Sequence, residues 1–171
     1  YIQSTATEKY DDVANTWIVK GNMNTARFEL AGFSLNGYGY TAGGYPSALR
    51  AVTEKYDDVA NTWTVKANLN TARYKLTGFS LNGYGYTAGG NTPIQAVTEK
   101  YDDVANTWTA KGNLNTARDD LAGFSLSGYG YTAGGVTTAY IQSTATEKSV
   151  KYYHHNYIEN YIIYSHMWCR I

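Results

Sequence analysis

The side chains most able to do chemistry are carboxylates that recur in pairs along the chain. Each pair of aspartates is followed three residues later by an asparagine: Asp11-Asp12 with Asn15, Asp57-Asp58 with Asn61, and Asp102-Asp103 with Asn106. Carboxylate and amide oxygens at this spacing suit a calcium ion. They also suit a capped β-turn, because these side chains accept hydrogen bonds from nearby backbone amides. We favour the turn and predict no metal site and no cofactor.

Nucleophiles and general bases are confined to the end of the chain. All three histidines and the only cysteine, Cys169, follow residue 148. Ser–His, Cys–His and His-ligated metal sites are therefore excluded from residues 1–148. The adjacent rings of His154 and His155 point apart on any regular element, and with His166 and Cys169 they match no zinc spacing. We predict that the protein is not an enzyme.

The charge balance narrows the class of partner. Lys plus Arg number 14 and Asp plus Glu number 14, so the formal net charge is zero. A nucleic-acid partner favours a basic face, and an anionic membrane surface attracts one, so we expect neither. No apolar run reaches the roughly 18 residues that span a membrane. The chain opens on Tyr1-Ile2 without Met or a signal-peptide pattern, so we expect a processed or partial chain whose compartment is not encoded.

Internal repeats organise the sequence. Residues 7–17 return almost unchanged at 53–63 and 98–108. Each copy leads to Asn-Thr-Ala-Arg and then to Gly-Tyr-Gly-Tyr-Thr-Ala-Gly-Gly. The copies open on threonines spaced by 46 and 45 residues, and a restart follows after 48 more. A period of about 45 residues without a 3.6-residue pattern favours an array of small β-sheets over a helical solenoid.

Each unit is predicted to form four short strands. The first, near residues 28–35, puts Ala31, Phe33 and Leu35 on one face, and the second covers 38–42. The third covers 52–56, and the fourth carries Trp63. Four antiparallel strands in a unit of this length are typical of one blade of a β-propeller.

Pairs of residues that contain glycine lie at the turns between these strands. Asn36-Gly37 joins the first two strands and is the pair preferred in a two-residue type I′ turn. Gly43-Gly44 ends the second strand, where the backbone needs positive φ or a close approach. The same turn signals recur in the other copies, so we expect the same hairpins there.

The unit resembles the kelch repeat over about residues 1–148. The resemblance lies in a double glycine, a Tyr-Asp pair, a tryptophan seven residues past that tyrosine, and a later arginine. It implies an all-β fold of four-stranded blades around a central axis, with the tryptophan packed between blades. An Asp-Asp pair stands where many kelch repeats have Asp-Pro, which we expect to change only a turn. The residues predicted to be structural are Trp17, Trp63, Trp108, Arg27, Arg73, Arg118, Gly43, Gly44, Gly89, Gly90, Gly134 and Gly135.

Three blades are too few to close a ring, since propellers have four to eight. Residues 1–9 are identical to 140–148, an offset of 139 residues, so the larger repeating unit is three blades long. We therefore expect a six-bladed ring, made by two copies of this chain or by a longer parent. The N-terminal strands are expected to complete the last blade, in this chain or in a partner.

The repeat pattern stops at residue 148, which divides the chain into a propeller segment, 1–148, and a divergent tail, 149–171. We interpret the tail as the product of a reading-frame change or a truncated copy. The alternative is a short helix, because Tyr153, Tyr157 and Tyr161 fall at helical spacing. Such a helix would cover an open blade edge.

Binding residues are sought where the copies differ, because loops on a rigid frame usually carry recognition. Two regions diverge: the loop after the double glycine, and the pair of residues after the arginine. Neutral drift of exposed loops is an equally weighted explanation. The candidate ligand-binding residues are Tyr45, Ser47, Arg50, Asn91, Thr92, Gln95, Thr137, Thr138, Phe28, Tyr74, Lys75 and Asp119.

The resemblance implies a protein-interaction module, because most kelch proteins are of that kind. We therefore expect a non-catalytic scaffold whose partner is another protein or a second copy of itself. Two alternatives stay open. One is a lectin-like propeller that stacks glycans on tyrosine faces, and the other is a structural repeat that assembles through unpaired blades.

Overall fold

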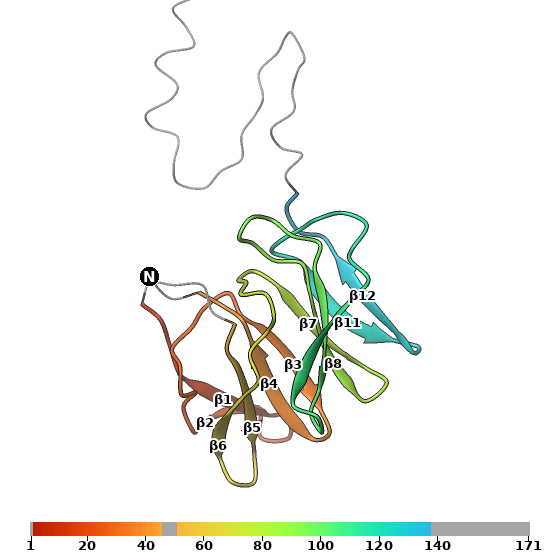
Figure 1. The fold of residues 1–171 in the computed structure, drawn as a ribbon. Helices are drawn as coiled ribbons and strands as arrows, with labels where there is room; N and C mark the ends of the chain where they lie inside the picture. Colours follow the sequence, from red (N-terminus) through yellow and green to blue (C-terminus); the bar gives the residue numbers. More distant parts are fainter. Residues whose placement is uncertain (1, 46–50, 138–171) are drawn as a thin grey trace, which may run out of the picture. The chain divides into compact units, whose positions relative to one another are not determined.

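The structure is a computed structural model, and it describes residues 2–45 and 51–137. This part of the chain is all-β, with twelve five-residue strands and no helix (Figure 1). The prediction of an all-β fold is therefore confirmed. The strands are β1 Thr7–Asp11, β2 Thr16–Lys20, β3 Ala31–Leu35, β4 Tyr38–Ala42, β5 Thr53–Asp57, β6 Thr62–Lys66, β7 Thr77–Leu81, β8 Tyr84–Ala88, β9 Thr98–Asp102, β10 Thr107–Lys111, β11 Ala122–Leu126 and β12 Tyr129–Ala133.

The strands form four antiparallel sheets in chain order. Strands β3–β6 form one four-stranded sheet, here named blade I, and β7–β10 form another, blade II. Strands β1–β2 and β11–β12 form two-stranded sheets, the N-terminal and C-terminal half-blades. The expected three blades are thus two complete blades and two halves, because the chain begins within one repeat and leaves its last hairpin without a second one among the described residues.

Strand register is the same in both complete blades. Ala42 pairs with Thr53 where β4 meets β5, and Ala88 pairs with Thr98 where β8 meets β9. Register is tightly specified when one face is buried, because a slip of one residue would turn every apolar side chain outward. Identical strand sequences therefore pair identically, which makes the register of any further copy predictable.

Local turn chemistry follows the sequence. Asn36 and Gly37 have φ of 52° and 82°, the two positive values that a type I′ turn requires, and Gly43 also has positive φ. In the turn between β5 and β6, Asp57 Oδ1 accepts hydrogen bonds from the backbone N–H of Val59 (2.9 Å) and Ala60 (3.0 Å). The capped turn predicted for the aspartate pairs is present here.

The apolar core lies between neighbouring blades. Along β3, Ala31, Phe33 and Leu35 are buried while the alternate residues are exposed, as the sequence predicts. The Phe33 ring meets Trp108 of blade II edge-on, with ring centroids 6.2 Å apart. A Cβ added at Gly85 would lie 2.1 Å from the Phe33 ring, so only glycine leaves room for this contact. Burying such an aromatic side chain stabilises the fold by about 2–3 kcal/mol.

The first strand of each repeat contacts the first strand of the next. Strand β7 touches both β3 and β11, and the three lie together in Figure 1. The Ser80 hydroxyl donates to the Ser34 carbonyl, and the Ser125 hydroxyl donates to the Ser80 carbonyl. Strands β3, β7 and β11 thus follow one another side by side in the order of the repeats. No helix in the described part is long and apolar enough to cross a membrane.

Candidate binding surface

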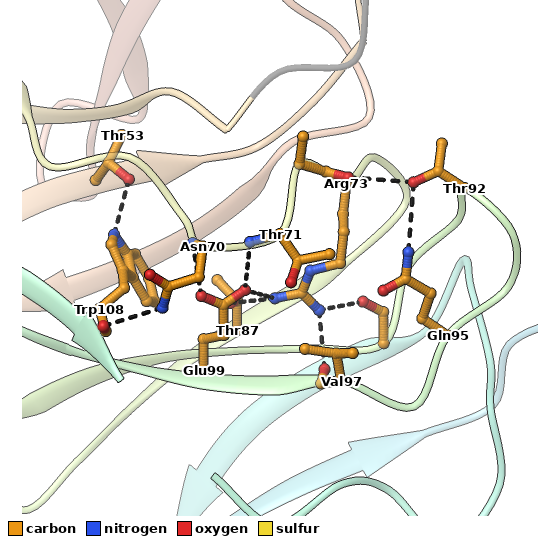
Figure 2. A network of polar contacts seen from close by, with 12 residues as sticks. Thr53, Asn70, Thr71, Arg73, Thr87, Thr92, Gln95, Val97, Glu99 and Trp108 are labelled. Atoms are coloured by element: carbon orange, nitrogen blue, oxygen red, sulfur yellow. Dashed lines mark hydrogen bonds and ion pairs between the residues drawn. The ribbon is translucent and has the colours of Figure 1, made fainter. Parts of the chain in front are cut away.

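The arginine of blade II sits inside the blade and holds its parts together (Figure 2). Arg73 Nη1 donates to the carbonyls of Gly89 (2.5 Å) and Val97 (2.8 Å). Its Nη2 donates to Thr87 Oγ1 (3.0 Å) and Glu99 Oε1 (3.1 Å). Arg73 is 0% exposed, so a charge this deep needs its carboxylate partner.

Glu99 completes this buried network. Its carboxylate accepts backbone N–H bonds from Asn70 (2.8 Å) and Thr71 (3.2 Å) as well as the bond from Arg73. Burial lowers the pKa of Arg73, and the charge of Glu99 opposes that effect. The pair therefore ties the loop before β7 to strand β9, and both side chains are already engaged.

Blade I repeats the network with the same geometry. Arg27 donates to the carbonyls of Gly43 (2.6 Å) and Val52 (2.8 Å), to Thr41 Oγ1 (2.9 Å) and to Glu54 Oε1 (3.1 Å). The sequence alone did not identify the glutamate, which lies 27 residues from the arginine along the chain.

The third arginine lacks this carboxylate. Arg118 donates to the Gly134 carbonyl (2.8 Å) and to Thr132 Oγ1 (2.8 Å), and no acidic side chain of the described residues is bonded to it. An open pocket of about 510 Å³ adjoins it, lined by Asn113, Leu114, Asn115, Thr116, Arg118 and Thr132. Asn115 and Thr116 correspond to Asn70 and Thr71, whose amides hold Glu99 in blade II. The pocket is therefore the site that a glutamate fills in the complete blades.

Trp63 and Trp108 pack between neighbouring sheets. Trp108 Nε1 donates to Thr53 Oγ1 (3.1 Å) and to the Ala67 carbonyl (3.0 Å). Thr53 begins β5 of blade I, and Ala67 directly follows β6 of the same blade. Trp63 makes the matching bonds to Thr7 Oγ1 and the Gly21 carbonyl at the N-terminal half-blade. Trp108 is 6% exposed, whereas Trp17, which has no sheet before it within residues 2–45 and 51–137, is 66% exposed.

In the second and third turns, the second aspartate bonds the preceding sheet. Asp58 contacts Lys9 Nζ (2.6 Å) and Lys20 Nζ (3.0 Å), and these hydrogen bonds lower the pKa of Asp58 to about 2. Asp103 contacts Lys55 (3.0 Å) and Lys66 (3.3 Å) in the same way. Burial raises the pKa of Asp103, but its hydrogen bonds outweigh burial and the net shift is downward. The paired carboxylates thus serve different partners, and the described residues hold no cluster of three metal-ligating side chains.

An aromatic row is formed by residues at which the copies differ. The Phe28 and Tyr45 backbones bond each other, and their rings meet with centroids 5.5 Å apart. Tyr45 in turn contacts Tyr74 of the next repeat at 5.3 Å. All three side chains are half-buried. The row therefore runs from the first repeat to the second.

A charged row runs beside the aromatic one. The backbone N–H of Lys75 donates to the Glu29 carbonyl (2.8 Å), and that of Asp120 donates to the Lys75 carbonyl (3.0 Å). Lys75 Nζ lies 2.7 Å from Asp120 Oδ2, and this bond raises the pKa of Lys75. Burial raises the pKa of Glu29, against the opposing charge of Lys75. Glu29 and Asp120 were not among the candidate residues, although they belong to the same diverging pairs.

The other candidate residues are divided between this surface and the frame. Asn91 Nδ2 donates to Asp119 Oδ2 (2.5 Å) beside the charged row. Thr92 Oγ1 donates to the Ala72 carbonyl (3.1 Å), and the backbone N–H of Gln95 donates to the Gly90 carbonyl (2.8 Å). Both residues therefore support the loop that follows the double glycine. Thr137 is half-buried at the end of the described part. Ser47, Arg50, Thr138 and the tail at 149–171 lie outside the described residues.

The sequence matches no protein-family model and no curated protein. The resemblance to the kelch repeat therefore rests on the residues of the repeat alone and stays a prediction. The architecture itself, repeated antiparallel sheets of four strands, is present in the structure.

Proposed function

We propose that this protein is a non-catalytic, kelch-type scaffold that binds another protein through the residues at which its repeats differ. The observation that carries the proposal is their convergence. Residues from three repeats meet in one surface, here named the variable surface: Phe28, Glu29, Tyr45, Tyr74, Lys75, Asn91 and Asp120. Asp119, a candidate from the sequence, is buried at 3% exposure and supports this surface through its bond to Asn91.

The distribution of polar groups supports binding over catalysis. The buried Arg73 and Glu99 neutralise each other, and the turn carboxylates of Asp57 and Asp58 are bonded to backbone amides and lysines respectively. Residues 1–148 hold no His or Cys to act as base or nucleophile. The groups at the variable surface are tyrosine, phenylalanine and charges, which are the usual contacts of a protein interface.

The two rows define the chemistry of the partner. Half-buried Tyr45 and Tyr74 offer flat amphipathic faces, and tyrosine is enriched among the residues that dominate binding energy. Lys75 is the one cation among the described residues of the charged row and interacts with two carboxylates, those of Asp120 and Glu29, so the row carries a net negative charge. A peptide that presents an apolar or aromatic side chain beside a cation fits this surface, since the cation also stacks on aromatic faces.

A displayed library of random peptides tests this proposal. Peptides enriched on the wild-type chain should lose at least about tenfold in affinity for the double variant Tyr45→Ala/Tyr74→Ala. The matched control is Val59→Ala, since Val59 is fully exposed on the turn between β5 and β6 and lies outside the variable surface. Peptides that bind the double variant as well as the wild type would contradict the proposal. Binding on a glycan array that depends on Tyr45, with no peptide enriched, would replace it with the lectin alternative.

A further inference from the structure

We propose that a second copy of this chain completes the C-terminal half-blade, with its β1 paired to β12 and its Glu8 in the pocket at Arg118. This inference is independent of the partner assigned to the variable surface. It rests on the repeats themselves, because the two complete blades show in detail what the half-blade lacks.

The strand edges are complementary in sequence. Strands β4, β8 and β12 all read Tyr-Gly-Tyr-Thr-Ala, and β1, β5 and β9 all read Thr-Glu-Lys-Tyr-Asp. In both complete blades the first sequence pairs with the second. Among the described residues β12 pairs only with β11, and β1 only with β2. The described part of each chain therefore carries one unpaired edge of each kind.

The register of the missing pairing can be copied from the complete blades. Thr41 pairs with Glu54, and Thr87 pairs with Glu99. By the same register Thr132 pairs with Glu8 of the second copy. An exposed strand edge is a template for such pairing, because its N–H and C=O groups are unsatisfied within the chain.

This register delivers a carboxylate to the pocket. Glu54 and Glu99 are buried against Arg27 and Arg73, whereas Glu8 is exposed in the single chain. In the paired state Glu8 accepts a hydrogen bond from Arg118 Nη2, next to the amides of Asn115 and Thr116. The pocket and the exposed glutamate thus match in charge as well as in position.

A second set of charges fits at the neighbouring sheet. Asp58 bonds Lys9 and Lys20 of the sheet before it, and Asp103 bonds Lys55 and Lys66. The next aspartate in this series is Asp12 of the second copy. Its expected partners are the two lysines of blade II at the same positions, Lys100 and Lys111.

The apolar surfaces at the two ends also correspond. Tyr40 of blade I is 2% exposed, but its counterpart Tyr131 in the C-terminal half-blade is 40% exposed. Trp17 and Val19 are exposed at the opposite end, on the N-terminal half-blade. In the complete interface Phe33 packs against Trp108, so Phe79 is expected to pack against Trp17 of the second copy.

The backbone at Gly112 leaves space for an asparagine side chain of the second copy. The Gly21 N–H donates to Asn61 Oδ1 (2.7 Å), and the Ala67 N–H donates to Asn106 Oδ1 (2.9 Å). A Cβ at Gly21 would lie 2.3 Å from the Asn61 carbonyl, whereas one at the equivalent Gly112 would meet nothing within 4 Å. Asn15 of the second copy is the residue that belongs at Gly112.

Two copies pair both half-blades of each chain at once. Each contributes blades I and II, and each half-blade of one copy joins the complementary half of the other. The contact is head-to-tail, and such contacts give a closed ring when the rotation per copy allows it. Two shared blades and four complete ones give the six-bladed ring expected from the repeat period.

A competing occupant lies in the same chain. Residues 146–148 repeat Thr7, Glu8 and Lys9, so Glu147 has the identity to fill the pocket. The repeat then breaks, and Asn156 stands where Trp17 stands in the first copy. The second copy offers a whole hairpin with its tyrosine and tryptophan, which is why we favour it.

Sedimentation of three single variants tests the proposal. The wild-type chain should sediment at twice its 18.9 kDa mass. Glu8→Ala and Arg118→Ala should each weaken the dimer by at least about 30-fold, because each leaves a buried charge without its partner. Glu147→Ala is the matched control and should stay dimeric. Circular dichroism should show the same strand content in all four proteins.

Mixing the two defective variants sharpens the test. A dimer of one Arg118→Ala chain and one Glu8→Ala chain has one intact Arg118–Glu8 junction and one junction with both charges removed. The mixture should therefore dimerise more tightly than either variant alone, because a dimer of either single variant has an unpaired charge at both junctions. Should Arg118→Ala fail to fold, Glu8→Gln carries the test, since Glu8 is exposed in the single chain.

Three outcomes would overturn the proposal. One is a folded wild-type monomer at micromolar concentration. Another is a dimer insensitive to both Glu8→Ala and Arg118→Ala. The third is a dimer that is weakened by Glu147→Ala but not by Glu8→Ala, which would assign the pocket to residues 146–148.

Discussion

The first hairpin of blade II, β7–β8, and the C-terminal half-blade, β11–β12, have nearly the same sequence but different surroundings. Arg73 of blade II is fully buried and bonded to Glu99, whereas Arg118 of the half-blade lines an open pocket. Ala88 is buried at the end of β8, and its counterpart Ala133 is exposed at the end of β12. In repeat proteins stability is a sum of unit and neighbour terms. The comparison shows that burial here comes from the neighbouring strands and blades rather than from the strand itself.

The largest expected difference between the two regions concerns the arginines. Arg73→Ala leaves Glu99 buried without its partner and should lower the free energy of unfolding by about 3–5 kcal/mol. Arg118→Ala removes two hydrogen bonds from a partly exposed site and should cost about 1–2 kcal/mol in the single chain. Urea denaturation at a protein concentration below that of dimer formation measures both. Equal losses would show that the neighbour does not decide the cost.

A smaller difference is expected at equivalent glycines. Gly85→Ala places a methyl group against the Phe33 ring of blade I and should destabilise the fold by about 2–3 kcal/mol. Gly39→Ala is the matched control, because its Cβ would lie 3.6 Å from Tyr56, which is ordinary contact. We expect Gly39→Ala to change stability by less than about 1 kcal/mol. Thermal unfolding of the two variants distinguishes them, and equal destabilisation would contradict the packing of Phe33 between blades.

The smallest expected effect is the pH dependence of the turn carboxylates. The lysines at Asp58 lower its pKa to about 2 from the ordinary value of 3.8. A group whose pKa is depressed in the folded state stabilises it above its unfolded pKa, and this stabilisation is lost as the pH falls. Between pH 5 and about 2 the melting temperature of the wild type should therefore fall more than that of Asp58→Asn. Parallel pH profiles would show that the Lys9–Asp58–Lys20 contact contributes nothing in solution.

The strands and turns could be predicted from the sequence because their causes are local. Alternation along β3 and the Asn36-Gly37 pair fix the strand and its turn within a few residues. Repetition then supplied the same assignment for every other copy. The buried arginine network could not be predicted, because Arg73 and Glu99 are 26 residues apart and meet only when the blade folds.

The binding role of the candidate residues stays a prediction, and the structure divides them into two groups. The differences between copies directed attention to the pairs after each arginine, and the structure brings Tyr74 and Lys75 next to residues of the other repeats. It also shows that Thr92 and Gln95 support their own loop. Sequence comparison within a chain detects variation but not the direction of a side chain, so it could not separate these two groups.

Amide hydrogen exchange in β12 tests the central claim most directly. If a second copy supplies β1, the β12 amides that point away from β11 should be as protected as the matching amides of β8 at high concentration and should lose that protection on dilution. The amides of β8 should stay protected throughout, because β9 belongs to the same chain. Protection of β12 that never appears, or that does not change on dilution, would contradict the account.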